Sequence, residues 1–539
     1  MSATNQIPAS VTNVGQEIIG TVSPAPKSLA VHHIPERSHS EKLYDTGNSE
    51  LLATTNDTDV LIVDWDGPDD PQNPKKYVVS AEQHARWTYS SCTVGAIDAN
   101  GPRQSLYHRF TFISPVSSSM IAPATGQVAS SFGIDNDVIL ALTTSIFVLA
   151  YAMGPLVLGP LSEIYGRSRV LQLANLWYLV WNLVCGFAQS ESQLIVFRFL
   201  AGLGGSAPLS IGGGFLGDCW QPHERGKAAA IYTLAPLMGP VLGPITGAWV
   251  AQYSTWRWVF WSTSIVDAAV QIVGAFALQE RRQIGFADRW MPEKAPYREI
   301  RTVFESQDRS WRTIMAKSLI RPFALFAHEP IVQLLGVYMA YLYGILYLFL
   351  TTMPSIFEGI YQQPVGIAGL HYAALGIGLL VASQLNARTM DKVYIYLTNK
   401  YGGVAKPEFR LPAMVPGSLL LPIGCLIVGW TAEAHTYWIA PDIGIALVGA
   451  GIILNFQCTQ TYIIDCFTLH AASAMAAVSC LRSLAGFGFP LFAPAMYNAL
   501  GFGKGDTILV VVAIVLGCPA PWILWHYGER IRNSSRHAR

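Results

Sequence analysis

Three segments of the chain combine charges, glycines and prolines in patterns that a plain lipid-facing helix does not need. The first carries Gly159, Glu163, Gly166, Arg167 and Arg169 within eleven residues. Glycines permit a tight turn and a close approach of helices, and one acid with two guanidiniums can pair with charges on a neighbouring helix end. Such a pairing could latch one conformation and release another. An ordinary basic loop would explain the charges but not the glycine spacing.

The second segment places Arg198 near the start of an apolar run that continues through Gly202 and Gly205. A guanidinium at such a position can extend to the membrane interface. However, the two glycines mark a helix face that packs closely against another helix, and a charge on such a face usually lines a polar cavity. We therefore expect Arg198 to have a functional role.

In the third segment Gly239, Gly243 and Gly247 recur every four residues, and Pro240 and Pro244 lie between them. A stripe of small residues lets a partner helix approach very closely, and each proline removes a backbone hydrogen bond and kinks the helix. A generic glycine packing face explains the glycines but not the paired prolines. The segment therefore predicts a helix with a conformational role.

Other ionisable residues, among them Asp442, lie within apolar runs. Asp267 is near the middle of its run, where an unpaired carboxylate would be costly. It could carry a proton or merely bond a neighbouring helix, and the sequence favours neither. His371 is expected to be a polar packing residue. Asp465 and Arg482 are expected to lie near helix ends, where they are structural or face the cytoplasm.

The elements that position these residues are predicted to be membrane-spanning helices. The chain of 539 residues is 51% hydrophobic and 13% charged, whereas soluble proteins carry roughly a quarter charged residues. Apolar runs of about twenty residues cross the hydrocarbon layer of a bilayer. Twelve such runs occur, at 110–132, 138–158, 170–188, 194–217, 227–250, 257–279, 331–353, 366–387, 412–430, 437–460, 472–498 and 507–526.

These runs divide the chain into five parts. Residues 1–107 form a polar tail rich in Ser, Asn, Asp and Pro, which is expected to be mostly disordered. Residues 108–279 contain the first six runs, 280–330 form a polar central loop, 331–527 contain the second six runs, and 528–539 form a short tail.

The loops that join the runs alternate in their content of Lys and Arg. The loops at 133–137, 189–193, 251–256, 354–365 and 431–436 have none, whereas the alternate loops, the central loop and the C-terminal tail are basic. Because short basic loops stay in the cytoplasm, both termini and the central loop are predicted to be cytoplasmic.

Several classes of function lack their usual signatures in the sequence. The net charge is zero, so nothing suggests a nucleic-acid partner. No G-x-x-x-x-G-K-[ST] element for ATP is present, nor is an H-E-x-x-H or G-x-S-x-G element for hydrolysis. The eight cysteines are scattered without a C-x-x-C pair, which favours small buried side chains over a metal site. We expect no enzyme activity, no metal and no cofactor.

The layout of six plus six helices resembles the major facilitator superfamily. The segment 159–169 resembles its helix 2–3 signature, with Glu163 where many members have Asp, and Arg198 with the following glycines resembles its helix-four signature. Residues 239–247 resemble the helix-five signature of proton antiporters. The segments 64–74, 329–331, 407–412 and 489–497 are similar to the fungal twelve-helix drug:proton antiporters, and the resemblance covers nearly all of 60–532.

This resemblance implies an all-α membrane fold in which two six-helix bundles, each built from inverted three-helix repeats, surround a central site. It implies export of a drug, toxin or fungal secondary metabolite, driven by the proton gradient. In this scheme protons moving inward neutralise a buried acid, for which Asp267 is the candidate, and Arg198 tunes that acid. The kinks between Gly239 and Gly247 shape a hinge, and the Glu163, Arg167 and Arg169 segment latches the outward state.

Alternatives remain open at this point. The substrate could be a polyamine, the direction could be nutrient uptake, and a channel or a transporter-like sensor represents a different class. The partners expected are a small molecule, protons and the lipid bilayer, with the protein acting as a monomer. The expected location is the plasma membrane, with the vacuolar membrane as the alternative.

Residues 77–109 do not match the expected apolar lead into the first helix. The stretch contains Glu82, His84, Arg86, Asp98 and Arg103. We interpret it as a divergent insertion or a mistranslated segment such as a retained intron. The first run, at 110–132, is Ser-rich and broken by Pro115 and Pro123.

Overall fold

The computed structural model describes residues 60–63, 111–211, 225–277, 299–302, 311–403, 406–467 and 471–535. The chain divides into two units, one of Met1–Gln72 with Gln283–Glu305 and one of Asn73–Arg282 with Ser306–Arg539. Residues 77–109 lie outside the described residues, as does most of the N-terminal tail.

The described part of the first unit is a pair of short strands that the sequence analysis did not predict. β1 (Val60–Val63) pairs in parallel with β2 (Glu299–Thr302), with Val60 opposite Glu299. β1 reads Val-Leu-Ile-Val, and β-branched side chains suit an extended backbone. The pairing joins a segment of the N-terminal tail to a segment of the central loop.

The first six predicted runs are helical in the second unit. Residues 111–119 form a helix that runs through Pro115, so the predicted break at that proline is wrong. The predicted break at Pro123 is confirmed, because η2 (Ala122–Ala124) interrupts the run before it continues as α3 (Thr125–Phe132). The helices that follow are α4 (Asp137–Tyr165), α5 (Arg167–Cys185), α6 (Glu191–Gly205), α8 (Arg225–Tyr253) and α9 (Arg257–Ala277).

The last six predicted runs are also helical, with longer helices than expected. They comprise α12 (Pro330–Pro354), the π-helical turn η3 (Ser355–Ile360), α13 (Val365–Leu370), α14 (Tyr372–Lys400), η4 (Pro407–Ala413), α15 (Met414–Glu433), α16 (Ile439–Cys466), α17 (Ala471–Gly517) and α18 (Pro519–Ser534). The predicted central loop contains a further helix, α11 (Trp311–His328). Within α17, Gly501 has a φ of 80° and separates two helices.

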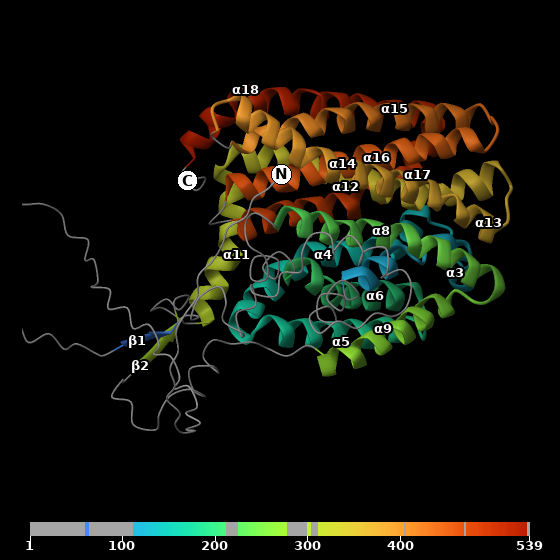
Figure 1. Cartoon of the computed structure of the whole chain (residues 1–539). Coiled ribbons are helices and arrows are strands. Elements are labelled where there is room, and N and C mark those ends of the chain that lie inside the picture. The colour runs from blue at the N-terminus through green and yellow to red at the C-terminus, as the bar shows by residue number, and fades with distance from the viewer. Residues whose placement is uncertain are drawn as a thin grey trace, which may run out of the picture. The chain divides into compact units, whose positions relative to one another are not determined.

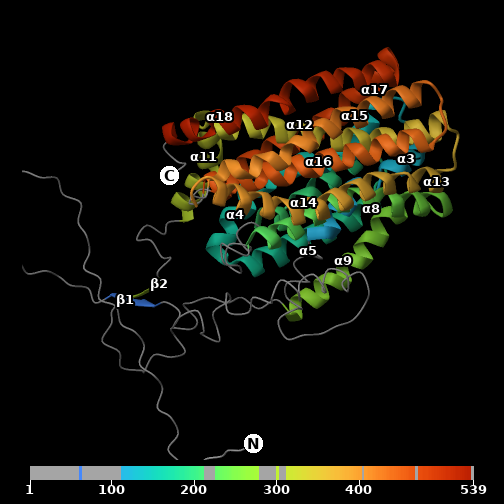
Figure 2. The same cartoon turned by 45° about the horizontal axis from the view of Figure 1, so that its top comes forward.

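The two halves of this unit form two groups of helices side by side. Figures 1 and 2 show α3 to α9 in teal and green next to α12 to α18 in yellow to red. The groups meet where α4 packs against α17 and where α8 packs against α13 and α14. Val148, Leu237 and Val241 of the first half belong to the same buried cluster as the core of the second half.

Large apolar side chains cover the outside of the helices. Leu173, Val381 and Val515 are each more than 60% exposed, as expected of surfaces that meet lipid. Seven helical stretches among the described residues are long and apolar enough to cross a membrane, and the last of them, Ser473–Asn533, contains the break at Gly501. α5 is not among the seven, because it carries buried polar residues such as Asn175 and Asn182.

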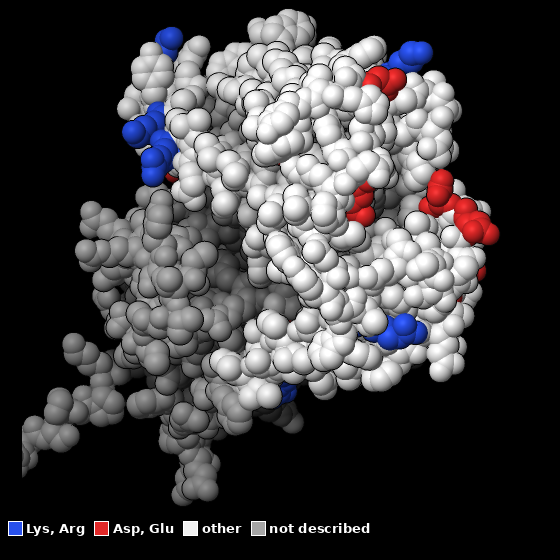
Figure 3. Space-filling view, turned by 90° about the vertical axis from the view of Figure 1, so that its right-hand side faces the viewer, with Lys and Arg blue, Asp and Glu red and all other residues white. Residues whose placement is uncertain are grey.

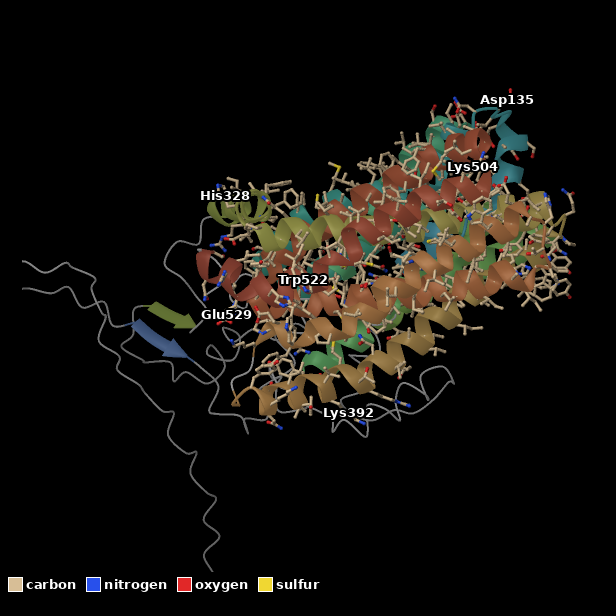
Figure 4. All side chains as sticks on the ribbon, turned by 90° about the horizontal axis from the view of Figure 1, so that it is seen from above. Asp135, His328, Lys392, Lys504, Trp522 and Glu529 are labelled. Atoms are coloured by element: carbon tan, nitrogen blue, oxygen red, sulfur yellow. The ribbon has the colours of Figure 1, made fainter. Side chains whose placement is uncertain are left out.

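The helical unit has two distinct ends. Figure 4 shows Asp135 and Lys504 at one end, here named the Asp135 end, and His328 and Glu529 at the other, here named the Glu529 end. Figure 3 shows the right-hand side of Figure 1 as mostly uncharged surface with scattered acidic and basic groups. Tyr253 at the end of α8 and Tyr437 before α16 are exposed, as are Tyr396 on α14 and Trp522 on α18. These residues fit the aromatic belts of a membrane protein.

Candidate functional site

Arg198 on α6 lies inside the first bundle. Its side chain is 1% exposed, and its Nη2 donates to the carbonyl oxygens of Ser118 at 2.8 Å and Thr144 at 3.3 Å. The guanidinium carbon lies 5.1 Å from the centre of the Phe147 ring and 5.6 Å from that of Phe260. The side chain therefore does not extend to the membrane interface, and carbonyls and aromatic faces stabilise its charge.

The Arg198 guanidinium still has unused hydrogen-bonding capacity. Its Nε and Nη1 atoms are buried without a hydrogen-bond partner. Buried donors are nearly always satisfied in native proteins, so these two N–H groups are available to a polar group that enters the interior.

The glycines that follow Arg198 bring α6 close to its neighbours. A β carbon built on Gly202 would lie 2.6 Å from the Phe147 carbonyl oxygen, and one on Gly205 would lie 2.3 Å from Ser114 Oγ. The predicted close packing of this face is confirmed. Only glycine fits here, because a real β carbon essentially never approaches another atom so closely.

Asp267 on α9 is fully buried and bonds the adjacent helix α5. Asn175 Nδ2 donates to both carboxylate oxygens at 3.1 Å and also lies 3.0 Å from Gln271 Oε1. Gln271 Nε2 in turn donates to the Gln172 carbonyl at 3.0 Å. The structure thus shows the helix-bonding role of Asp267 that the sequence left as one of two options, and it is compatible with a proton on the same carboxyl group.

A second polar hub lies on the same face of α5. Ser117 Oγ donates to Asn182 Oδ1 at 3.0 Å. Asn182 Nδ2 lies within 3.1 Å of the Phe260 carbonyl, Thr263 Oγ1 and Ser264 Oγ. Asn175 and Asn182 are seven residues apart, so helical periodicity places both on the face turned to α9.

The structure does not bring Arg198 and Asp267 into contact. Among the described residues the partner of Asp267 is Asn175, and the partners of Arg198 are carbonyl groups. The fully buried Tyr178 packs against the Phe147 ring at 6.3 Å, and Arg198 lies over that same ring. On α5, Tyr178 is three residues from Asn175, the partner of Asp267. Arg198 can therefore influence Asp267 only at a distance and not through a direct bond.

The stripe of glycines on α8 packs against the first helix. A β carbon on Gly239, Gly243 or Gly247 would lie 2.6 Å from Pro115 Cβ, 2.4 Å from the Val116 carbonyl oxygen or 2.0 Å from the Met120 carbonyl oxygen, respectively. Pro240 and Pro244 lie inside the helix, together with Pro236. The predicted close approach is confirmed, and residues 115–120 are the partner.

Ser119 compensates for one of these prolines. Pro244 has no N–H, so it cannot bond the carbonyl of Pro240 four residues earlier. Ser119 Oγ donates to that Pro240 carbonyl at 2.8 Å. The first helix thus supplies a hydrogen-bond donor to the Pro240 carbonyl, which Pro244 leaves without one.

We expect Ser119→Ala to lower the unfolding free energy by about 1–3 kcal/mol, because a buried carbonyl loses its donor. The measurement is the apparent melting temperature of the detergent-purified protein. Ser130→Ala is the control, since exposed Ser130 bonds only the nearby Gln127 carbonyl at 2.9 Å. Equal melting temperatures for the two variants would contradict this role of Ser119.

One hydrogen bond joins the two bundles next to a cluster of aromatic rings and a second arginine in the second bundle. Ser118 Oγ and the Tyr347 hydroxyl of α12 share a hydrogen bond of 3.0 Å, and the rings of Tyr347 and Tyr343 are 5.0 Å apart. Arg482 on α17 places its guanidinium carbon 5.2 Å from the ring centres of both Tyr343 and Phe456. Arg482 lies within α17 and is 8% exposed among aromatic rings, so the expectation that it lies near a helix end and the option that it faces the cytoplasm are both wrong. Its structural role stays a prediction.

The bundles are in close contact at the ends of helices near Asp135. The Gly366 N–H donates to Gln252 Oε1 at 2.7 Å, and a β carbon on Gly369 would lie 2.2 Å from Ala248 Cβ. Asn498 Nδ2 donates to Asp137 Oδ2 at 3.4 Å. These contacts join α8 to α13 and α4 to α17, so the two bundles are closed together at the Asp135 end.

The predicted latch segment differs from expectation in its backbone. α4 continues as far as Tyr165, so the expected loop is reduced to Gly166, which has a φ of 95° and directly precedes α5. A β carbon on Gly159 would meet nothing within 4 Å, so close packing is not the reason for that glycine. Arg167 and Arg169 lie in the first turn of α5. The Glu163 side chain lies outside the described residues, so its latch role remains a prediction.

Ion pairs tie the second bundle together near the Glu529 end. Arg410 Nε bonds Asp465, and Arg410 Nη1 lies 3.8 Å from Asp391. Arg532 pairs with the buried Glu408 at 2.7 Å, and Lys406 pairs with Glu529 at 2.8 Å. The structural role expected for Asp465 is confirmed.

Sequence reasoning missed two buried acids, Glu408 and Asp506. Asp506 is 1% exposed and accepts a hydrogen bond of 2.6 Å from the Tyr497 hydroxyl. The sequence analysis placed Asp506 in a loop, whereas it lies in the helix after Gly501. Among the described residues no group of three His, Cys, Asp or Glu side chains is arranged to hold a metal ion.

Comparisons with known proteins agree with this architecture. The family model described as Major Facilitator Superfamily matches residues 110–525. The chain is 45% identical to the efflux pump vrtL of Penicillium aethiopicum, over 91% of this chain and 94% of that protein. It is 38% identical to the MFS-type transporter penM of Penicillium rubens, over 92% of this chain and 93% of that protein.

Solved structures show the same fold at low sequence identity. A partially occluded inward open structure of the xylose transporter XylE from E. coli matches with a TM-score of 0.57 and 14% identity, over 79% of this chain and 96% of that chain. An inward-facing bacterial homolog of the human lysosomal transporter Spinster matches with a TM-score of 0.56 and 13% identity, over 81% of this chain and 99% of that chain.

Proposed function

This chain belongs to the Major Facilitator Superfamily, and we propose on that premise that it exports a small organic molecule in exchange for protons. It is a multi-pass membrane protein and a secondary transporter. The relative named as an efflux pump, which is 45% identical over most of the chain, supports the outward direction. The substrate class we propose is a drug, toxin or fungal secondary metabolite.

The observation that carries the proposal of proton exchange is the polar interior of the first bundle. The carboxyl group of Asp267 and the guanidinium of Arg198 are both buried inside this bundle, away from lipid. Ionisable residues inside a membrane protein are costly and usually serve ion or proton pathways. We propose that Asp267 takes up and releases the transported proton while Arg198 tunes its environment.

The closed Asp135 end fits one state of an alternating-access cycle. α8 is held against α13, and α4 against α17, at that end. We propose that a substrate site between the bundles opens to the other side in this state. We propose that the Asp135 end is extracellular, because the loops there lack Lys and Arg apart from Lys504. The bundles then rock about the site, α8 serves as the hinge helix, and the Glu163 segment latches the outward state.

The location and the assembly state belong to the same proposal. Both termini and the central loop are cytoplasmic, and the pairing of β1 with β2 supports a common side for the tail and the loop. We propose that the protein works as a monomer in the plasma membrane without ATP or a cofactor. The buried Arg198 and Arg482 near the bundle interface disfavour a polyamine, because a polycation would be repelled there.

The test is expression in a yeast strain that lacks its own pumps, scored for resistance to toxins, azoles and polyamines. We expect resistance to at least one organic compound and its loss when an uncoupler collapses the proton gradient. Increased sensitivity through accumulation would indicate uptake, conduction insensitive to the uncoupler would indicate a channel, and binding without flux would indicate a sensor.

Asp267→Asn tests the proton carrier directly. We expect this variant to lose gradient-driven export but to keep substrate exchange without a gradient, because the amide can still bond Asn175 but cannot titrate. The measurement is uphill transport and counterflow in proteoliposomes. Asp506→Asn is the matched control, since Asp506 is equally buried in the other bundle and bonds Tyr497. Uphill transport by Asp267→Asn at the rate of the unmodified protein would remove Asp267 from the mechanism.

A further inference from the structure

We infer that His371 and Asp442 form a second proton-binding site, which takes its proton from the outer solution and favours closure of the Asp135 end. The inference rests on the proposed exchange of substrate for protons and adds a group outside the first bundle. It revises the expectation that His371 is only a polar packing residue.

The two residues meet although they are 71 positions apart in the sequence. His371 connects α13 to α14, and Asp442 lies in the first turn of α16. His371 Nδ1 lies 2.9 Å and 2.8 Å from the two Asp442 carboxylate oxygens. On the opposite edge of the ring, Nε2 lies 2.7 Å from Gln363 Oε1.

Aromatic rings fix the plane of the imidazole. The Phe357 ring of η3 stacks on it with a centroid distance of 3.7 Å and an interplanar angle of 2°. Trp438, just before α16, contacts it edge-on at 5.5 Å. The imidazole therefore cannot rotate away from Asp442 and Gln363 without breaking the stack.

The acceptors on both edges of the ring make the site responsive to protonation. An imidazolium ring donates from both nitrogens at once, so it satisfies the Asp442 carboxylate and the Gln363 carbonyl oxygen together. A neutral imidazole donates from one nitrogen only. If Nδ1 keeps its proton, the Gln363 amide must turn to present its NH2 group to Nε2. Loss of the proton thus reverses the direction of the hydrogen bond between His371 and Gln363, and it removes the charge that pairs with the Asp442 carboxylate.

The turn that carries Gln363 leads directly into the contact that closes the two bundles. The Gln363 N–H donates to the Phe357 carbonyl at 3.0 Å, and the preceding Gln362 has a φ of 53°. Three residues later the Gly366 N–H donates to Gln252 of α8. α13 therefore lies between the Gln363 turn and His371 in sequence and packs against the other bundle in space.

The pair is also better placed than Asp267 to exchange protons with solvent. The side chain of Asp442 is 18% exposed and that of His371 is 7% exposed, whereas Asp267 is 0% exposed. α13 and the part of α8 between Gly239 and Gln252 contain no ionisable side chain. At this end of the surrounding elements the ionisable groups are Asp442 on α16, Glu358 on η3, Tyr361 at its end, Tyr372 on α14, Tyr253 at the end of α8, and His435 and Tyr437 before α16.

The sign of the effect fits an exporter. A proton taken from the acidic outer solution fixes the Gln363 turn and holds α13 against α8. Closure of the outer end then returns the carrier to the inward-facing state, ready to bind the next substrate molecule. Release of the proton loosens the turn and permits the outer end to open.

The experiment measures the separation of the bundles at the Asp135 end as a function of pH. Spin labels are attached through ketone-bearing residues at the exposed positions 135 and 504, which leaves the native cysteines unchanged. In the reconstituted full-length protein we expect the short distance between the two labels to gain population as the pH of the solution is lowered. In His371→Gln we expect that pH response to be lost.

The controls separate titration from packing. His435→Asn changes an exposed histidine in the turn before α16 and should keep the full pH response. Asp442→Asn, which keeps a hydrogen-bonding group opposite Nδ1, should diminish the response even if His371→Gln folds poorly.

An unchanged pH response in either His371→Gln or Asp442→Asn would overturn the inference, as would the absence of a response in the unmodified protein. Resistance in the yeast assay is scored separately. Absence of the pH response in the unmodified protein, together with retained, uncoupler-sensitive export, refutes this site alone, whereas absence of export by the unmodified protein refutes the proposed function.

Discussion

Export by Arg198→Ala is expected to fall by at least roughly tenfold while the protein remains folded and reaches the membrane. The side chain makes charge-assisted bonds to the Ser118 and Thr144 carbonyls, and hydrogen bonds to charged groups contribute about 1.5–3 kcal/mol. A loss of that size in the transport barrier corresponds to a roughly 10- to 100-fold slower rate. The measurement is the initial rate of uncoupler-sensitive efflux, normalised to the amount of protein in the membrane.

The matched control is Arg257→Ala in the same bundle. Arg257 also donates to a carbonyl, that of Ala188 at 3.0 Å, and also lies over an aromatic ring, that of Trp256 at 4.4 Å. It differs from Arg198 in lying at the start of α9, away from Tyr178 and the bundle interface. We expect Arg257→Ala to export at close to the normal rate. Undiminished export by Arg198→Ala would exclude that residue from the mechanism.

The conservative change Arg198→Lys separates charge from geometry. An ammonium group keeps the positive charge but lacks the planar fork that can bond two carbonyls and stack on rings. Loss of export in Arg198→Lys would show that the shape of the guanidinium is needed. Retained export in this variant together with loss in Arg198→Ala would show that the charge alone is sufficient.

The sequence predicted the helices well because lipid imposes a simple requirement on each of them. A span must be about twenty apolar residues long whatever its neighbours are, so twelve runs could be found without knowing how they pack. The same reasoning failed at 159–165, where Gly-Pro-Leu-Ser resembles a turn but continues α4 to Tyr165. It also missed α11, since that helix is too polar to stand out as an apolar run.

Close contacts between helices could be predicted where a pattern of glycines in the sequence indicates them. Gly202, Gly205 and the stripe from Gly239 to Gly247 all lie against a neighbour at distances that exclude a β carbon. The identity of the neighbour was not accessible, because 115–120 and 239–247 are more than a hundred residues apart. Gly159 belongs to an equally suggestive pattern and has no neighbour within 4 Å.

The polar contacts between distant residues could not be predicted from one sequence. Tyr347 and Ser118 are 229 residues apart, and His371 and Asp442 are 71 apart. A chain with 23 tyrosines gives no reason to select Tyr343 and Tyr347 as the pair at the bundle interface. The signal that was available is the presence of an ionisable residue in an apolar run, and it identified Asp267, His371 and Asp442 without their partners.

Gly247→Ala is expected to destabilise the protein strongly although it adds only one methyl group. The new β carbon would lie 2.0 Å from the Met120 carbonyl oxygen, a backbone atom that cannot move without displacing the first helix. Overpacking of this kind costs about 1–3 kcal/mol, and Gly247→Leu should prevent folding altogether. The measurement is the apparent melting temperature in detergent, followed by size-exclusion chromatography.

Gly126→Ala is the appropriate control, because Gly126 also lies in a helix of the first bundle, α3, and a β carbon there meets nothing within 4 Å. We expect this variant to melt at the normal temperature or slightly above it, since alanine favours helix more than glycine does. If Gly247→Ala has the same apparent melting temperature as Gly126→Ala, the glycine stripe of α8 tolerates side chains. In that case the close packing of α8 against residues 115–120 would not be needed to stabilise the position of α8.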